Sequence, residues 1–314
     1  MLLARVADSL YWMGRYLERA EHVSRALAIR LEDMVEQGDS DVAEAWARLA
    51  SVLGQPSEAA QADPVSFAFA QTFEKANPSS VMNCVRLARD NARQIREQIS
   101  TEIWFTLNTQ FLRLQALTEA EWRVAPSAQS RATVDALVMI AGLIDSTMRH
   151  GEGWHFLTLG RHIERAQLVA RMLQAHFAGP ATLPEPDHGD WITLLKTHVA
   201  FEPYCKVYTA TLHPRRIGEF LIFDGMFPHS LRFAVDRIYD ELQHAGPGMP
   251  QGRRQACLRH AGRLRASLDY GQVDELLAGD AGLFFADVQK RCAEIHRAVS
   301  DTFFAYGIEE MIGR

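Results

Sequence analysis

The chain has 314 residues, which is enough for one large domain or two fused domains, and 47% of them are hydrophobic and 23% charged. These ordinary globular values exclude a disordered, collagen-like or purely coiled-coil protein. The net charge of −6 gives no general attraction to nucleic acid or to an anionic membrane. We therefore expect a folded protein whose partners include neither nucleic acid nor a membrane.

The cysteines and the N-terminal segment indicate a reduced, cytoplasmic protein. Arg5, Asp8 and Arg15 interrupt the apolar residues at the start of the chain, so a signal peptide is not expected. No window of about twenty apolar residues is present, so we expect no membrane span. The cysteines form no CxxC pair and lie far apart, at Cys84, Cys205, Cys257 and Cys292.

Apolar residues recur at helical spacing along most of the chain, and no alternating β-branched run appears, so the sequence predicts an all-α fold. The first predicted helix runs from Ala7 to Gln37, and Gly38 ends it. Helices are then predicted at 41–53, 66–75, 80–100, 101–115, from 119 onward and 129–148. In the second half a helix is predicted at 154–177, followed by a loop at 179–189. Further helices are predicted at 191–200, 202–212, 215–223, 230–244, 251–270 and from 273 to near Tyr306.

Two of these helices carry an internal repeat. Residues 14–25, GRYLERAEHVSR, align without a gap to residues 160–171, GRHIERAQLVAR, at an offset of 146. The repeat predicts a large helical bundle with two related halves, 1–150 and 151–314, whose long helices cross at the centre. Seven positions are identical, namely Gly14/Gly160, Arg15/Arg161, Glu18/Glu164, Arg19/Arg165, Ala20/Ala166, Val23/Val169 and Arg25/Arg171.

The charged residues of the repeat have two interpretations. Glu18, Arg19, Glu164 and Arg165 could form structural ion pairs where the two helices meet. Alternatively, the two Glu-Arg pairs form a charged pocket, in which arginine forks bind a carboxylate or phosphate and glutamate accepts from an amine or hydroxyl. Stability alone is a weak reason to bury such charges. A mid-helix glycine is unfavourable, so its recurrence indicates close helix approach or space for another group.

A stripe of arginines follows in residues 86–97, RLARDNARQIRE. The plainer interpretation is a solvated or ion-paired helix face. The alternative is that Asn91, Arg93 and Arg96 face the Glu-Arg pocket and hold an anionic group there. Trp154 lies beside the second repeat and is a candidate pocket wall, although a tryptophan is by default part of the core.

Several common site types are absent from the sequence. Glu18 and His22 do not match the Glu-x-x-His spacing of carboxylate-bridged di-iron bundles, and no HExxH is present, so we expect no metal. No GxxxxGK, GxSxG or GxGxxG motif occurs. We therefore expect no bound cofactor, and any ATP-dependent step belongs to a partner.

The segments GRYLERAEH, VRLARDNARQIREQIS, GEGWHFLTLGRHIERA and DGMFPHSLRFAVDRI together resemble the bacterial alpha-E family, a helical family named for its Glu-Arg motif. The resemblance covers essentially the whole chain and implies a single alpha-E-like domain over 1–314. It further implies a neighbouring or fused circularly permuted ATP-grasp protein, with a transglutaminase-like peptidase as a second partner, and a role in forming peptide or amide bonds.

The leading hypothesis is therefore a component of a peptide- or amide-ligase system that does not itself bind ATP, as an accessory or a catalytic subunit. Glu18 and Glu164 would act as base or orient an amine. The alternative is a helical interaction scaffold whose Glu-Arg motifs are structural ion pairs, and assembly into a homo-oligomer is left open. Substrate-binding residues in the leading hypothesis are Arg15, Arg19, Arg161, Arg165, Asn91, Arg93, Arg96 and Trp154.

Overall fold

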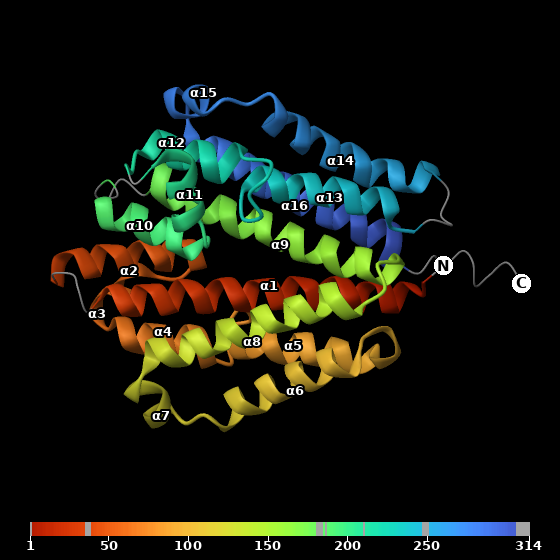
Figure 1. The fold of residues 1–314 in the computed structure, drawn as a ribbon, viewed down its shortest axis with the longest axis horizontal. Coiled ribbons are helices and arrows are strands. Elements are labelled where there is room, and N and C mark those ends of the chain that lie inside the picture. The colour runs from red at the N-terminus through yellow and green to blue at the C-terminus, as the bar shows by residue number, and fades with distance from the viewer. Residues whose placement is uncertain are drawn as a thin grey trace, which may run out of the picture.

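The computed structural model describes residues 2–34, 39–179, 185, 187–209, 211–246 and 251–305. Within these ranges the chain forms helices and no strand, which confirms the all-α prediction. Two long helices, α1 (Ala4–Asp33) and α9 (Glu152–Phe177), lie side by side through the centre of the molecule (Figure 1). The predicted helix ends at Gln37 and Tyr306, and positions 180–184 and 186 of the predicted loop, lie outside the described residues.

The first half continues from α1 through a series of shorter helices. Serine residues cap the N-termini of two of these helices: the Ser80 and Ser100 hydroxyls accept hydrogen bonds from backbone amides in the first turn of each helix. The elements are α2 (Asp39–Leu53), α3 (Ser57–Ala62), α4 (Pro64–Phe73), α5 (Val81–Gln94), the 3-10 turn η1 (Arg96–Gln98), α6 (Thr101–Ala116), α7 (Glu119–Val124) and α8 (Pro126–Thr147).

The second half follows α9 in the same manner, and the Ser230 hydroxyl caps one of its helices by accepting from the Phe233 amide. The elements are α10 (His188–Thr197), α11 (Phe201–Tyr208), α12 (Pro214–Gly218), the π-helical turn η2 (Glu219–Phe223), α13 (Leu231–His244), α14 (Gln251–Asp269), α15 (Val273–Ala278), α16 (Ala281–Val299) and the π-helical turn η3 (Ser300–Phe304).

Several predicted helices differ from the observed ones, and the helix predicted at 202–212 ends at Tyr208. The single helix predicted from Val273 is two helices, because Gly279 ends α15 and the Asp280 carboxylate caps α16 by accepting from the Leu283 amide at 3.0 Å. The helix predicted at 80–100 ends at Gln94 and tightens into η1. The short helix α3 at 57–62 was not predicted.

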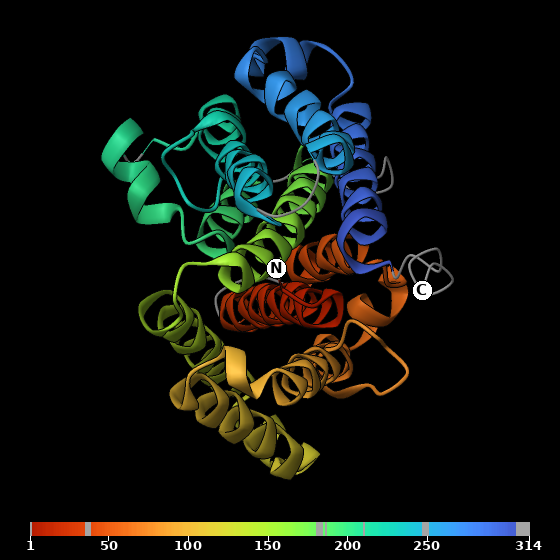
Figure 2. The same ribbon diagram turned by 90° about the vertical axis from the view of Figure 1, so that its right-hand side faces the viewer.

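The two halves use equivalent packing. In the first half α1 packs against α5 and α8, and α6 packs against both of these. In the second half α9 packs against α13 and α16, and α14 packs against both of these. Seen along the bundle, the first set lies on one side of the central pair and the second set on the other (Figure 2). The structure therefore confirms the two related halves predicted from the repeat.

The helices that follow the central pair are exchanged between the halves. α2, in the first half, packs more extensively on α9 than on α1, and α10, in the second half, packs on α1. Arg30 of α1 donates to the Asp190 carboxylate of α10 at 2.8 Å, and Arg48 of α2 lies 3.5 Å from the same carboxylate. This ion-pair cluster joins three helices at one end of the bundle.

The central pair also carries the core. Leu10, Leu27, Leu157 and Ile163 are fully buried along the contact between α1 and α9. Such burial of apolar side chains is the main stabilising contribution in a bundle of this kind. Among the described helices, none combines the length and the apolar character needed to cross a membrane.

Candidate functional site

The central helices approach most closely at the two repeated glycines. A Cβ atom on Gly14 would lie 2.1 Å from the Leu157 carbonyl oxygen, and a Cβ atom on Gly160 would lie 2.1 Å from the Tyr11 carbonyl oxygen. Tyr11 and Leu157 are themselves related by the repeat offset of 146, so the two contacts are equivalent by a pseudo-twofold rotation. Only glycine permits this approach, which brings the Glu-Arg residues one turn later face to face.

The Glu-Arg pairs are formed across the two helices, not within either of them. Arg19 Nε donates to Glu164 Oε1 at 2.6 Å, and Arg165 Nε donates to Glu18 Oε1 at 2.6 Å. Both carboxylates are buried, with 6% and 2% of Glu18 and Glu164 exposed. Hydrogen-bonded arginine–carboxylate pairs of this length are the strong class of protein hydrogen bonds.

The carboxylate of Glu164 is fully enclosed by two arginines. Arg15 Nε donates to its Oε2 atom at 2.7 Å while Arg19 donates to the other oxygen, and Arg15 Nη2 donates to Gln167 Oε1 at 2.9 Å. Burial acts to raise the pKa of Glu164, but the two guanidiniums outweigh it and hold that pKa below its usual value. Glu164 is therefore ionised and has its charge balanced inside the protein.

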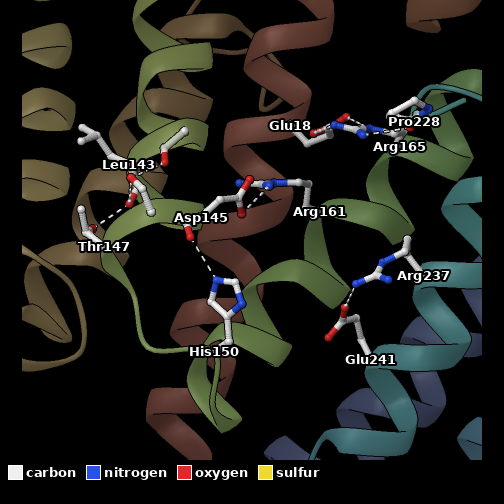
Figure 3. Close-up of polar contacts among 12 residues, drawn as sticks. Glu18, Leu143, Asp145, Thr147, His150, Arg161, Arg165, Pro228, Arg237 and Glu241 are labelled. Carbon is white, nitrogen blue, oxygen red and sulfur yellow. Dashed lines mark hydrogen bonds and ion pairs between the residues drawn. The ribbon is translucent and has the colours of Figure 1, made fainter.

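Among the described residues, a single arginine donates to the carboxylate of Glu18. Arg165 donates to both of its oxygens, at 2.6 and 2.9 Å, and to the Pro228 carbonyl at 3.0 Å (Figure 3). Arg161, the repeat mate of Arg15, points away from Glu18 and lies 3.5 Å from Asp145 Oδ1 on α8. Within the described ranges Arg161 makes no hydrogen bond, although only 12% of its side chain is exposed.

A cavity of about 240 Å³ lies beside this second pair. Its lining combines four apolar residues with three acidic side chains, three arginines and a histidine. Burial, and then the charge of Arg165, lower the pKa of His229 well below its usual value, so this histidine is neutral. The cavity is lined by Leu17, Glu18, Glu21, Arg25, Leu137, Val138, Ala141, Asp145, Arg161, Arg165 and His229.

A larger hollow of about 500 Å³ lies at the C-terminal ends of α2 and α9. Its one charged lining residue is Arg171, an exposed side chain, and its other polar groups include Gln174 and Gln289, which bond to each other at 2.7 Å. The lining residues that the structure describes include neither a carboxylate nor a second cation. We therefore take the smaller, charged cavity as the candidate functional site.

Two further buried histidines lie near His229 and were not predicted as part of the site. The rings of His22 and His198 meet edge to face with centroids 5.7 Å apart, and each leaves its Nε2 atom buried without a partner in the described part of the chain. Burial, then Arg25, lowers the pKa of His22 to about 4, and burial, then His22, lowers that of His198 to about 3. Both are neutral near pH 7.

The remaining predicted substrate-binding residues lie apart from the lining of the cavity. The Asn91 amide donates to the Leu87 carbonyl of its own helix at 3.0 Å, and Arg93 is exposed. The guanidinium of Arg96 lies 4.6 Å from the ring centre of Trp104. Trp154 stacks on His150 at 4.2 Å. Arg15 and Arg19 are engaged by Glu164, which leaves Glu18, Arg161 and Arg165 at the cavity.

Sequence reasoning missed a second repeat that supports the site. Pro78, Ser80, Val85 and Asp90 recur as Pro228, Ser230, Val235 and Asp240, at an offset of 150. Each copy presents its loop to a motif arginine. Arg19 Nη1 donates to Ser79 Oγ at 3.4 Å, and Arg165 Nη1 donates to the Pro228 carbonyl. The Pro-x-Ser signal ahead of a helix could have revealed this pair, but four matches in thirteen positions are few.

The described residues hold no group of three or more histidine, cysteine, aspartate or glutamate side chains placed to bind a metal ion.

The family model of Alpha-E, described as a predicted alpha-helical domain with a conserved ER motif, matches residues 2–304. Uncharacterized proteins Mb2597 of Mycobacterium bovis and MT2643 and Rv2567 of Mycobacterium tuberculosis are each 26% identical over 95% of this chain. The chain spans 36% of their length. No solved structure matches the chain.

Proposed function

The chain belongs to the Alpha-E family, and from its charged cavity we propose that it is the anion-binding component of a peptide- or amide-ligase system that works with an ATP-grasp partner. In this proposal the cavity receives a small molecule that carries a carboxylate or phosphate group. The partner carries out the ATP-dependent step. Catalysis and partnership are both parts of the proposal.

The observation that carries the proposal is the state of Arg161. Its repeat mate Arg15 has its donors bound to Glu164 and Gln167, whereas Arg161 lines the cavity without a hydrogen bond to any described residue. A guanidinium carries five N–H donors in a planar fork that fits a carboxylate or phosphate. A mostly buried arginine with free donors beside a cavity is what recognition of an anion requires.

In this proposal Glu18 orients an amine or hydroxyl of the ligand. Arg165 donates to both of its oxygens, yet an ionised carboxylate has about four acceptor sites, so two remain for a ligand. Glu164 does not line the cavity and its charge is balanced by two arginines. The proposal therefore gives Glu18 the catalytic or orienting role, and Glu164 a structural one.

The partner is proposed on the family resemblance and on the length of the relatives. The matched region is 36% of the mycobacterial proteins, so each relative has ample additional chain for a second domain. An ATP-grasp enzyme would transfer a phosphoryl group from ATP to a carboxylate, giving an acyl phosphate and ADP. Attack by an amine would then form the amide and release phosphate.

The test combines the chain with a circularly permuted ATP-grasp protein from the same genome. ATP turnover and product mass are measured with the original chain and with the Glu18→Gln and Arg161→Gln variants. We expect an amide product that requires this chain and is lost with both variants. Arg86→Gln, which alters an exposed arginine on α5, serves as the matched control and should leave the product unchanged.

Thermal unfolding of each variant separates a loss of function from a loss of folding. If the ATP-grasp protein forms the product equally well alone, the ligase proposal is wrong. If the original chain is required but both cavity variants are fully active, the cavity has no part in the reaction.

The second candidate function is an interaction scaffold, and exposed apolar side chains on α6 and α8 favour it. Phe105 and Leu112 on α6 are 68% and 49% exposed, and Val138 and Met139 on α8 are 50% and 58% exposed. Large exposed apolar groups on neighbouring helices can mark a protein contact. A pull-down of the ATP-grasp protein that survives Arg161→Gln but is lost with Phe105→Ser would favour the scaffold.

A further inference from the structure

Resting on the function proposed for this cavity, we infer that the group bound by Arg161 is the carboxylate of a small molecule with an apolar body. We further infer that Asp145 is an internal competitor, which occupies the place of that carboxylate until a ligand displaces it. The inference uses the cavity, the two repeats and the position of Asp145 on α8.

The first motif shows how the repeat holds a carboxylate. Arg15 and Arg19 each donate to one oxygen of Glu164, at 2.7 and 2.6 Å. Arg161 and Arg165 occupy the same two positions in the second motif. Arg165 is engaged by Glu18, so Arg161 is the member of the pair that remains available for a carboxylate from outside the motif.

Asp145 and Arg161 form a weaker ion pair than those between Glu164 and its two arginines. The closest atoms, Arg161 Nη1 and Asp145 Oδ1, are 3.5 Å apart, which is beyond hydrogen-bonding distance for a charged pair. The Asp145 side chain is 54% exposed, so water screens the interaction. Asp145 also lies in the last turn of α8, where the helix dipole disfavours an anion. A ligand carboxylate that reaches Arg161 would therefore displace Asp145 readily.

The charges and the walls of the cavity favour a carboxylate over a phosphate. The lining carries three carboxylates and three guanidiniums, which balance. Exchange of Asp145 for a ligand carboxylate leaves one negative charge on Arg161, whereas a phosphate dianion would bring two. Leu17, Leu137 and Val138 supply apolar surface to the lining, which suits a hydrocarbon body. The volume of 240 Å³ equals that of about eight water molecules, so the ligand is small.

Direct binding measurements test the inference without the ligase reaction. The probes are isovalerate, its neutral amide isovaleramide, and inorganic phosphate, each titrated calorimetrically into the original chain and into Asp145→Asn, Arg161→Gln and Asp135→Asn variants. Asp135 lies on the same helix and is exposed, so Asp135→Asn is the matched control. Unfolding temperature is recorded for every variant.

We expect isovalerate to bind the original chain. Asp145→Asn should bind it about threefold or more tightly than the original chain does, because removal of a competitor raises the fraction of binding-competent protein. Arg161→Gln should abolish binding, Asp135→Asn should leave it unchanged, and isovaleramide should not bind.

Each contrary outcome overturns a different statement. Failure of every probe on every variant, Asp145→Asn included, rejects the anion-binding function. Binding that depends on Arg161 but is no tighter in Asp145→Asn rejects the competitor while the proposed function stands. Phosphate binding more tightly than isovalerate rejects the carboxylate.

Discussion

The two copies of the Glu-Arg motif share seven of twelve residues, yet their carboxylates have different surroundings. Glu164 accepts from Arg15 and Arg19 and is enclosed, whereas Glu18 accepts from Arg165 alone and lines a cavity. The difference shows that one sequence pattern can supply both a structural ion pair and an accessible charged site, depending on which second arginine turns toward the carboxylate.

Small differences around the repeat account for this asymmetry. Gln167 accepts a hydrogen bond from Arg15 and draws it toward Glu164. The equivalent residue, Glu21, pairs with Arg25 of its own helix instead. Arg161 consequently has no comparable acceptor on α1 and turns to Asp145 on α8.

The largest effect is expected from Glu164→Gln. This change leaves the charges of Arg15 and Arg19 buried without a counter-charge, and breaking a buried pair in this way costs about 3–5 kcal/mol of unfolding free energy. Chemical denaturation of the purified protein measures the loss. Glu18→Gln is the comparison, with an expected loss of about 1–3 kcal/mol, because only Arg165 loses its partner and it keeps the Pro228 carbonyl.

An equal loss for Glu18→Gln and Glu164→Gln would mean that the two motifs are energetically equivalent, contrary to the asymmetry described above. A smaller loss for Glu164→Gln than for Glu18→Gln would reverse the assignment of the structural copy.

The glycines test what the halves have in common. Gly14→Ala and Gly160→Ala each place a methyl group against a carbonyl oxygen of the neighbouring backbone, and we expect each to lower stability by about 3 kcal/mol. Gly142→Ala on α8 is the control, because no heavy atom lies within 4 Å of its added methyl group. Gly142→Ala should instead raise stability by about 0.5–1 kcal/mol. Unequal losses for Gly14→Ala and Gly160→Ala in thermal unfolding would break the pseudo-twofold equivalence.

The smallest effect is a pH dependence of stability that arises from two buried histidines. His22 and His198 have pKa values of about 4 and 3 in the folded protein, while an unfolded histidine titrates near 6.5. Below pH 6.5 the unfolded chain binds more protons than the folded chain, so stability falls as the pH decreases toward 4. At pH 5 each histidine has lowered the free energy of unfolding by up to about 2 kcal/mol.

Denaturation at a series of pH values measures this slope. His198→Gln should flatten the slope between pH 6.5 and 5, whereas His244→Gln, at an exposed position on α13, should not. An unchanged slope in His198→Gln would show that the buried histidines do not govern the acid sensitivity.

The sequence predicted the helices and the central repeat because both depend on local spacing. The helical periodicity of α1 and α9 and the offset of 146 are visible without a structure. The ion-pair partner of Arg15 was not visible, because spacing along one helix offers Arg15 only near neighbours such as Glu18 and Arg19. The actual partner, Glu164, is reached only across the contact made by the glycines.

The arginine stripe of residues 86–97 shows the same limit. Its spacing places the arginines on one face of a helix but does not indicate the direction in which that face points. In the structure Ala88 and Ala92 of α5 are buried, while Arg93 and Arg96 are exposed. Asp145 and His229 of the candidate site come from the end of α8 and from the loop before α13, and no local pattern connects them with Glu18.

The exchange of α2 and α10 between the halves has a consequence for how the chain can be divided. Since α2 packs more extensively on α9 than on α1, and α10 packs on α1, a fragment that ends between α8 and α9 would leave apolar surfaces uncovered in both pieces. We therefore expect each piece to fold stably only in the presence of the other. Cutting the chain near 149–151 would therefore give a split protein in which folding signals that the two halves have bound each other.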